Sequence, residues 1–450
     1  MHFAETQDET LPKHCCKDDF MPYQRAPDTY DVLPFSPIKD SWLHSAQWRY
    51  VEGVFRDVCR RFGYREIRTP ILERTELFTR HIGEETDIVS KEMFTFTDKG
   101  GRSMTMKPEG TAPVVRACLE NKLFNDHSML KLYYIGQNFR YERGQKGRYR
   151  QHQQLGIEAF GSKDPALDAE VIQLSMIFYR ELGITEQELH INSVGSPDSR
   201  VAYKEALRDF VRPFLTEMSV EGQNRFEANP MRMLDTKDQK DLALLENAPR
   251  LVDYLDEESR IHFDKLQTYL GAAGISFQID HKLVRGFDYY TNTCFEVIGQ
   301  GLGSQSTLCG GGRYDGLVEA CDGPPTPGVG FGAGIERCLI SLEALGIELP
   351  IEDERPVAFI ITLGDEAIVR PAAVQLLTEL RTSGVSADID YRGKKFGQQA
   401  KRADELGSRY ALILGDNEVA AGTIQIRDQA TKEQREISLA EAISELKRIS

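Results

Sequence analysis

The sequence lacks the short motifs that mark the most easily recognised nucleotide, metal and nucleophile sites. The absence of a G-x-x-x-x-G-K-[ST] stretch excludes a P-loop, and neither H-E-x-x-H nor G-x-S-x-G occurs. The 8 cysteines form no C-x-x-C pair and no Cys/His run has zinc-finger spacing, so protein motifs predict no metal site. A chain of this size is not expected to depend on disulfides, and we predict reduced thiols and a cytoplasmic location.

Long hydrophobic runs are also missing. No window approaches the roughly 18 consecutive apolar residues of a transmembrane helix, so no membrane association is expected. The segment MHFAETQDETLPKHCCKDD is polar and acidic, unlike a secretory signal, and we expect residues 1–20 to be disordered. The net charge of −15 argues against indiscriminate binding to nucleic acids, although it permits a locally basic RNA site.

The remaining composition is that of an ordinary globular protein, with 40% hydrophobic and 28% charged residues. At about 150 residues per domain, the length suggests about three domains or sub-domains. The acidic stretch LPIEDER (349–355) predicts a linker between a first domain over residues 21–348 and a second over 356–450. Residues 198–276 are charged and helix-prone, which predicts a helical insertion in the first domain. Strands and helices alternate after the linker, so the second domain is expected to be α/β with a mixed sheet.

Periodic patterns predict the elements of the first domain. Apolar residues recur at helical spacing from Ile38 to Phe62, and Gly63 supplies the stop. The following segment YREIRTPILE predicts a strand interrupted by Pro70, which cannot donate to a ladder and belongs at an edge, a bulge or an interface. Residues 283–298 also predict a strand.

Residues 131–160 predict two strands around a polar loop. Along the second strand, polar and apolar side chains alternate, so that Gln154, Gly156 and Glu158 form a polar row on one face. A sheet with one apolar face and one polar face is typical of a ligand-binding surface, although a polar face that is simply exposed to solvent is more common. The glycine-rich strand GVGFGAG (328–334) has a face without side chains, on which either a flat ligand or a closely packed helix is expected.

Three segments, in order, resemble the signature motifs of class II aminoacyl-tRNA synthetases. The helix 38–62 with YREIRTPILE is similar to the first motif, and GQNFRYERGQKGRYRQHQQLGIEAFG to the second. The third motif resembles GVGFGAGIERCL. This resemblance implies an α+β catalytic domain with an antiparallel sheet, and a homodimer formed through the first motif, whose helix is expected to expose an apolar stripe in a single protomer.

Further segments narrow the resemblance to one family. MKPEGTAPVVRA (106–117) and LVRGFDYYTNTCFE (283–296) are similar to the two histidine-recognition signatures of histidyl-tRNA synthetases. SVGSPDSR, NPMRMLDTKD and LGSQSTLCGGGRYDGL also resemble that family, and the resemblance covers about residues 22–450. It implies ATP-dependent activation of L-histidine, with Mg²⁺ as part of the ATP complex, and transfer to the terminal ribose of histidine tRNA. The second domain is expected to bind the anticodon.

The expected reaction brings a carboxylate to the α-phosphate of ATP, so the site has to neutralise charge and fix geometry. Guanidinium forks suit phosphate better than ammonium groups do. The resemblance implies that Arg140 holds the α-phosphate and that Arg337 holds the γ-phosphate, with adenine between Arg337 and an aromatic ring. It implies that Arg285 meets both the α-phosphate and the histidine carboxylate, so Arg140 and Arg285 are the candidate catalytic residues. Arg148 is a further phosphate ligand.

Histidine offers an ammonium, a carboxylate and an imidazole that donates from one nitrogen and accepts at the other. Glu109 and Thr111 suit the ammonium, while Gln154 can bridge the ammonium and the carboxylate. Glu158 can accept from an imidazole N–H, and Tyr290 can bond the other ring nitrogen. A site of paired polar groups rejects substrates that lack them by about 10⁴–10⁵.

Tyr289 and Tyr290 are expected on opposite faces of a strand, so that at most one meets the ligand directly. Two departures from the family pattern stand out. Lys107 replaces the usual arginine of Arg-Pro-Glu-Gly-Thr, which keeps the charge and loses the fork. Pro27-Asp28 stands where the family often has Arg-Gly.

Contact with RNA is expected to be local. The loop RYERGQKGRYRQ holds five basic residues and one acidic residue, and the resemblance implies that it reads the extra guanosine at the 5′ end of histidine tRNA. Gln145 and Arg150 stand at the matching positions. A second patch, YRGKKFGQQAKR, suits anticodon phosphates, although a solvated helix face is its alternative reading.

Two other functions were weighed against the enzyme. A non-catalytic paralogue, such as a regulatory subunit of ATP phosphoribosyltransferase or a kinase sensor domain, tends to lose the arginine of LVRG or the C-terminal domain, and both are present here. A class II synthetase for another amino acid is disfavoured by Glu158 together with LVRGFDYY.

Overall fold

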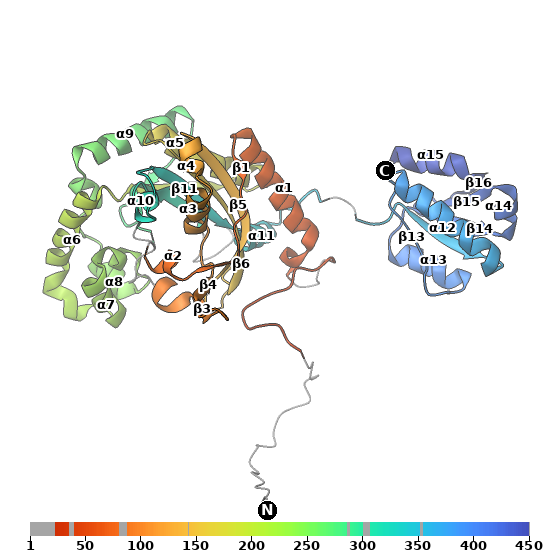
Figure 1. Cartoon of the computed structure of the whole chain (residues 1–450), viewed down its shortest axis with the longest axis horizontal. Coiled ribbons are helices and arrows are strands. Elements are labelled where there is room, and N and C mark those ends of the chain that lie inside the picture. Colours follow the sequence, from red (N-terminus) through yellow and green to blue (C-terminus); the bar gives the residue numbers. More distant parts are fainter. Residues whose placement is uncertain are drawn as a thin grey trace, which may run out of the picture. The chain divides into compact units, whose positions relative to one another are not determined.

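The computed structural model of the chain describes residues 23–35, 40–80, 88–142, 144–285, 289–299, 307–351 and 354–449. Residues 1–20, for which disorder was predicted, lie outside these ranges. The chain forms two compact units, Met1–Ile351 and Glu352–Ser450, which are described separately (Figure 1). Over the described ranges, no helix combines the length and the apolar character needed to cross a membrane.

The first unit is built on an eight-stranded sheet in the order β1-β5-β6-β11-β10-β9-β7-β8. Its six central strands are antiparallel, and the two-residue edge strands β1 and β8 pair in parallel. The antiparallel α+β architecture predicted from the sequence is therefore confirmed. The strands are β1 Arg65–Glu66, β5 Leu130–Phe139, β6 Gln151–Phe160, β7 Gln187–Ser193, β8 Gln278–Ile279, β9 Thr291–Gly299, β10 Thr307–Arg313 and β11 Gly328–Gly334.

Three helices, α1 (Ser45–Arg61), α5 (Pro165–Glu181) and α11 (Ile335–Ala344), share a core with the apolar side of β6. Phe55 of α1 packs edge-on against Phe178 of α5, with ring centroids 5.3 Å apart. The apolar stripe of α1 is thus buried inside its own protomer, and the expectation that it stays exposed is wrong. The helix ends before Gly63 (φ 80°) as predicted. It begins later than Ile38, because Asp40 is left-handed (φ 60°) and only a short 3₁₀ turn, Ser41–Leu43, precedes Ser45.

A second, three-stranded sheet has the order β2-β4-β3 and lies beside α2 (Glu76–Thr79) and α3 (Thr111–Glu120), and α4 (Leu123–Asp126) follows α3. Its strands are β2 Leu72–Arg74, β3 Phe94–Thr97 and β4 Ser103–Met106. Pro70 separates β1 from β2, so the two halves of the segment YREIRTPILE join different sheets. The predicted break at Pro70 is therefore a crossing between sheets.

The helical insertion predicted for residues 198–276 contains α6 (Pro197–Val211), α7 (Val220–Ala228), α8 (Gln239–Leu244) and α9 (Glu257–Ala272), with 3₁₀ turns at Arg212–Glu217, Pro230–Asp235 and Leu251–Tyr254. Side chains of Ser196, Ser219, Asp238 and Asp256 cap the four helices. The predicted strand 283–298 is shorter than expected, because β9 begins only at Thr291. A four-residue helix, α10 (Leu317–Ala320), follows β10.

The second unit has a mixed five-stranded sheet in the order β13-β12-β14-β15-β16, as predicted. β12 (Ala358–Leu363) pairs in parallel with β13 (Ala387–Ile389) and β14 (Tyr410–Gly415), and the antiparallel pairs bring in β15 (Thr423–Asp428) and β16 (Gln434–Ser438). The helices are α12 (Glu366–Thr382), α13 (Phe396–Glu405), α14 (Asp416–Ala421) and α15 (Leu439–Ile449). The sequence did not predict α14 and β16, which are short and lack a clear apolar period.

Candidate active site

A cavity of about 450 Å³ opens at the polar face of the large sheet in the first unit, and we call it the active-site cavity. Nine of the residues singled out from the sequence line it: Glu109, Thr111, Arg140, Arg148, Gln154, Arg285, Tyr289, Tyr290 and Arg337. Glu158 lies directly behind this lining and bonds to Thr111. Gln145 and Arg150 do not line the cavity.

The strand alternation of β6 explains why polar side chains gather on this face. Gln154 and Glu158 point away from the core that holds Leu155 and Ile157, as the period of two requires. The neighbouring glycines of β11 give these side chains room. A Cβ at Gly330 would lie 2.3 Å from Oε2 of Glu158, and one at Gly332 would lie 2.0 Å from Nε2 of Gln154. The glycine face therefore seats the protein's own polar side chains.

One end of the cavity, which we call the acidic end, contains two buried carboxyl groups. Glu109 accepts hydrogen bonds from the backbone N–H groups of Thr111 (2.6 Å) and Ala112 (2.8 Å) at the start of α3. Glu158 accepts from the Thr111 hydroxyl (2.8 Å) and from the Tyr314 hydroxyl. Burial raises the pKa of Glu158 to about 8, and it also raises the pKa of Glu109 above its ordinary value. A ligand that brings positive charge and N–H donors lowers these pKa values and favours the ionised carboxylates, so the two groups are suited to such a ligand.

Tyrosine rings surround the acidic end. The rings of Tyr289 and Tyr290 lie 4.9 Å apart, and that of Tyr314 lies 5.7 Å from Tyr289 and 6.3 Å from Tyr290. All three residues line the cavity, as does Tyr134. The expectation that Tyr289 and Tyr290 lie on opposite faces of a strand is wrong, because both precede the first residue of β9 and both line the cavity.

The other end of the cavity, the arginine end, is formed by Arg140, Arg148 and Arg337. The Arg337 guanidinium donates to the carbonyl oxygens of Gly147 (3.2 Å) and Thr307 (3.0 Å). Burial, together with the nearby charge of Arg148, lowers the pKa of Arg337. The carboxylate of Glu142 lies 3.7 Å from Arg140 and 3.4 Å from Arg148. Converging guanidinium groups of this kind favour a polyanionic ligand.

Arg285 lies on the wall of the cavity, where its Nη1 donates to Oε1 of Glu296 (2.6 Å). Its guanidinium covers the backbone of Gly310, where a Cβ would lie 2.3 Å from Nη1. The Arg285 Nε is buried and has no hydrogen-bond acceptor among the residues that the structure describes. A buried donor without an acceptor is costly, so a ligand atom fits this position.

His152 and Tyr314 are among the cavity residues that the sequence reasoning missed. His152 shares the face of Gln154 on β6, so the same alternation identifies it. Burial and the charges of Arg140 and Arg337 lower the pKa of His152 to about 3, so its ring is neutral at physiological pH. Tyr314 comes directly after β10, and its hydroxyl reaches Glu158 on β6. Because β10 and β6 are far apart in the sequence, no local pattern near either residue predicts this contact.

The loop between β5 and β6, residues 140–150, carries both residues expected to meet tRNA. Gln145 is exposed in a tight turn closed by backbone hydrogen bonds with Arg148 (2.8 and 3.2 Å). Arg150 is more enclosed: its guanidinium carbon lies 4.0 Å from the centre of the Tyr141 ring, and its Nε lies 3.2 Å from Oδ2 of Asp28. Gln145 is therefore more accessible to a partner than Arg150.

Lys107, the first departure from the family pattern, lies outside the active-site cavity. Its side chain is buried, its Nζ donates to the Thr69 hydroxyl (3.2 Å), and burial lowers its pKa. The substitution of the family arginine thus bears on the segment before Pro70 and leaves the lining of the cavity unchanged.

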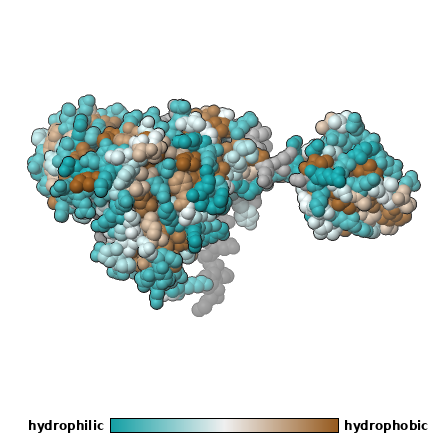
Figure 2. Space-filling model, turned by 90° about the horizontal axis from the view of Figure 1, so that it is seen from above, coloured by the Kyte–Doolittle hydropathy of each residue, from teal (hydrophilic) through white to brown (hydrophobic). Residues whose placement is uncertain are grey.

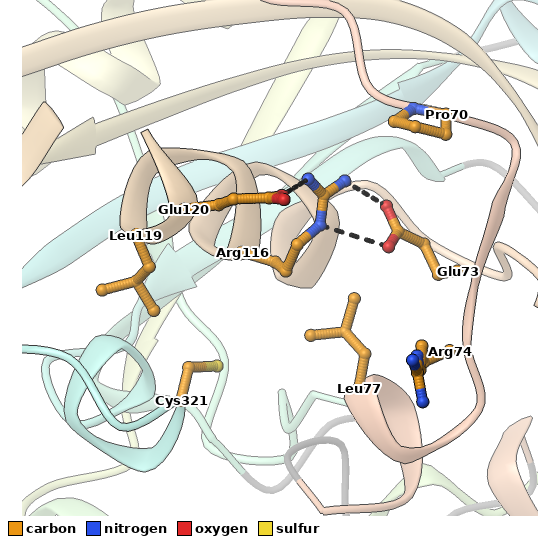
Figure 3. A pocket seen from close by; sticks show the side chains of 8 residues that line it. All are labelled: Pro70, Glu73, Arg74, Leu77, Arg116, Leu119, Glu120 and Cys321. Carbon is orange, nitrogen blue, oxygen red and sulfur yellow. Dashed lines mark hydrogen bonds and ion pairs between the residues drawn. The ribbon is translucent and has the colours of Figure 1, made fainter. Parts of the chain in front are cut away.

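A second cavity of about 470 Å³ lies between Pro70, α3 and Cys321 (Figure 3). Its Arg116 is held by Glu73 through Nε (3.2 Å) and Nη2, and by Glu120 through Nη1 (2.9 Å). An arginine with carboxylates on both sides has little capacity left for an anion, so we assign the chemistry to the active-site cavity. Within the described ranges, no group of three His, Cys, Asp or Glu side chains is arranged to hold a metal ion.

Comparisons with known proteins point to one family over both units. Residues 43–338 match the family model described as Histidyl-tRNA synthetase, and residues 357–449 match the model described as Anticodon binding domain. A histidine–tRNA ligase of Anoxybacillus flavithermus is 49% identical over 432 residues, which are 95% of this chain and 100% of that protein. The histidine–tRNA ligase of Bacillus subtilis is 48% identical over 430 residues, with coverage of 95% and 99%.

A solved structure agrees with these matches. The crystal structure of apo histidyl-tRNA synthetase from S. aureus superposes with a TM-score of 0.78 at 40% sequence identity, and the match covers 94% of this chain and 100% of that chain.

Proposed function

The chain belongs to the histidyl-tRNA synthetase family, and we propose that its active-site cavity is where L-histidine reacts with ATP before the histidyl group passes to tRNA. The enzyme is a class II histidine–tRNA ligase. No observation favours a regulatory paralogue, since Arg285 and the C-terminal unit are both present.

The observation that carries the proposal is the division of the cavity into an acidic end and an arginine end. Histidine brings an ammonium and imidazole N–H groups, which complement Glu109 and Glu158. ATP brings phosphates, which complement Arg140, Arg148 and Arg337. The reacting carboxylate and α-phosphate are both negative, so the reaction needs cationic groups at the junction, and Arg285 and Arg140 are the residues proposed for that task.

At the acidic end, Glu109 and Thr111 are proposed to hold the ammonium, and Gln154 to bridge the ammonium and the carboxylate. Asn138 donates to Oε1 of Gln154, which fixes the amide so that its NH₂ group remains the donor. Glu158 is proposed to accept from the imidazole. Tyr290 is proposed to bond the other ring nitrogen, and Tyr289 closes the same side of the pocket.

At the arginine end, Arg337 is proposed to hold the γ-phosphate and Arg148 a second phosphate. We propose His152 as the aromatic ring that faces Arg337 across the adenine, because its neutral ring can stack without adding charge. Mg²⁺ would enter as part of the ATP complex. It is usually held by one or two carboxylates together with substrate phosphates, and Glu142 and Glu296 on the cavity wall fit that pattern.

The direct test of the whole proposal is histidine-dependent exchange of pyrophosphate into ATP. Exchange with histidine, and none with other amino acids, supports activation at this cavity. A protein that binds histidine without exchange would instead be a regulatory paralogue. We keep a cytoplasmic location as part of the proposal, in agreement with the unpaired thiols of the described cysteines.

For tRNA we propose two contact regions, each within one unit. Gln145 and Arg150 on the loop 140–150 are proposed to meet the acceptor end. In the second unit, Lys394, Lys395 and Lys401 lie exposed in and before α13, and the ring of Tyr391 in the same segment is also exposed. Exposed lysines and an exposed aromatic ring in one segment suit the phosphates and bases of an anticodon loop.

Gln145→Ala is expected to impair transfer to tRNA more than pyrophosphate exchange, because an exposed amide offers a donor and an acceptor to a base edge. The loss should correspond to about 1–3 kcal/mol, measured as kcat/KM for aminoacylation. A tRNA without the extra guanosine should show little difference between parent and variant. If Gln145→Ala discriminates the two tRNAs as well as the parent does, Gln145 is not the reader.

A homodimer is expected, and the apolar surface that supports it lies on the three-stranded sheet. Leu72 and Phe96 are 45% and 44% exposed, and the register of β2-β4-β3 puts them on the same face. Figure 2 shows one side of the first unit, on which apolar patches interrupt a mostly hydrophilic surface. An uncovered apolar face next to Pro70 is typical of an interface.

Leu72→Asp is therefore expected to convert a dimer to a monomer at micromolar concentration, as measured by sedimentation. Val220→Asp is a matched control, since Val220 is 76% exposed on α7 and should leave assembly unchanged. A parent protein that is monomeric and fully active would contradict the proposal.

A further inference from the structure

The segment 23–35 runs directly beneath the loop 140–150. The backbone N–H of Arg150 donates to the carbonyl oxygen of Asp28 (2.9 Å). The ring of Tyr30 lies 5.0 Å from that of Tyr149. The N-terminal segment is thus the support on which this loop rests, although the two are more than a hundred residues apart in the sequence.

Asp28 has an unusual backbone conformation for a residue with a side chain. Its φ is 57°, a region that glycine, asparagine and aspartate tolerate better than other residues do. The family pattern that the sequence resembles has glycine at this place, so the backbone conformation is compatible with that pattern, and the carboxylate of Asp28 is a departure from it. The departure at Pro27-Asp28 therefore adds a charge without requiring a new loop shape.

The carboxylate of Asp28 is closely fitted into the loop. Its Oδ2 lies 3.2 Å from Nε of Arg150. It also lies over the backbone of Gly144, where an added Cβ would come within 2.0 Å of Oδ1. The glycine thus provides the space that the carboxylate occupies.

The contacts of Arg150 leave one end of its guanidinium open. Its Nε donates to the Glu142 carbonyl oxygen (3.5 Å) and forms an ion pair with Asp28 (3.2 Å), and its plane packs on Tyr141. Among the described residues, no acceptor engages the two Nη groups, and the side chain keeps 21% exposure. A fork held from behind and open in front is oriented for an external acceptor such as a phosphate.

We propose that Asp28 is a positioning residue for tRNA binding: it fixes Arg150 on Tyr141 so that the Nη edge of the guanidinium is already oriented when the tRNA phosphate arrives. The inference rests on the proposed role of Arg150 in contacting tRNA. Fixing a flexible side chain before binding removes an ordering cost that the complex otherwise carries. The opposite effect, in which Asp28 weakens tRNA binding, also has a physical basis, because a carboxylate beside a phosphate-binding guanidinium repels the phosphate and competes for the cation. The sign of the effect on tRNA affinity therefore decides the question.

Asp28→Asn and Asp28→Gly are the informative variants, because both residues accept the positive φ and both remove the charge. We expect each to raise KM for histidine tRNA about two- to fivefold, the effect of a partly exposed ion pair. Turnover, KM for ATP and histidine-dependent pyrophosphate exchange should stay within about twofold of the parent. Arg150→Gln should raise KM for tRNA at least as much, and adding Asp28→Asn to it should have no further effect.

Gly144→Ala gives an independent test of the fit between Gly144 and the carboxylate. The new methyl group would displace the Asp28 carboxylate, so KM for tRNA should rise in the parent background. In the Asp28→Gly background the space is open, and Gly144→Ala should have no effect. If Gly144→Ala changes KM for tRNA equally in the parent and in the Asp28→Gly background, the inference is wrong.

The outcomes separate this inference from the function on which it rests. If Asp28→Asn lowers KM for tRNA, the carboxylate competes with phosphate and the inference is wrong. If Arg150→Gln raises KM while the Asp28 variants do not, Arg150 binds tRNA without help from Asp28, and the inference fails alone. If Arg150→Gln leaves KM for tRNA unchanged, the proposed role of Arg150 fails and the inference fails with it.

Discussion

Arg285→Ala is expected to lower the rate of histidine-dependent pyrophosphate exchange by about 10²–10³, the loss seen when a preorganised group that stabilises developing charge is removed. Arg285 is held in advance of the reaction, by Glu296 on one side and by the backbone of Gly310 on the other. Charge that is fixed before the reaction needs no reorganisation as the α-phosphate is attacked. Histidine binding should weaken less than turnover, because the largest effect belongs to the transition state.

Two control variants make this expectation specific. Arg285→Lys keeps the charge and loses the planar fork, so an intermediate rate is expected. Arg116→Ala removes an arginine that is likewise paired with carboxylates beside a cavity of similar size, yet it lies away from the active-site cavity (Figure 3). Its exchange rate should remain close to that of the parent. Near-normal exchange in Arg285→Ala would remove Arg285 from the reaction.

Local periodicity predicted those parts of the site that lie on regular strands. The alternation of β6 identified Gln154 and Glu158, because side-chain direction along a strand depends only on sequence parity. The same argument failed for Tyr289 and Tyr290, where the chain had not yet entered β9. The error came from the strand boundary, which is the least certain feature of a sequence pattern.

Contacts between distant segments could not be predicted in this way. Tyr314 reaches Glu158 across the sheet, and Asp28 reaches Arg150 from the N-terminal segment. Both contacts depend on which strands become neighbours, and no residue near either partner specifies that order. The apolar stripe of α1 was misjudged for the same reason, since the sequence does not say that α5 covers it.

A buried ionic network links the helical insertion to the catalytic sheet, and no local pattern in the sequence predicts it. Arg313, the last residue of β10, is fully buried and forms a bidentate pair with Asp168 of α5. Its Nη1 also donates to the Ser162 carbonyl oxygen (2.8 Å). His262 of α9 lies 3.3 Å from the same aspartate. Asp168 of α5 thus joins the strand that carries Arg313 to the last helix of the insertion.

Arg313→Met is expected to lower the free energy of unfolding of the first unit by about 3–5 kcal/mol, because it leaves the charge of Asp168 buried without its partner. Both tryptophans, Trp42 and Trp48, are buried in this unit, so their fluorescence during urea unfolding reports its stability. The deficit should shrink as the pH falls, since burial raises the pKa of Asp168 once the guanidinium is removed and only His262 remains beside it, so that the folded form takes up a proton before the unfolded form does. The double variant Arg313→Met, Asp168→Leu should recover part of the loss, because no buried charge remains. A loss below about 1 kcal/mol in Arg313→Met, or a double variant with the full sum of both single losses, would mean that the pair contributes through packing and not through its charge.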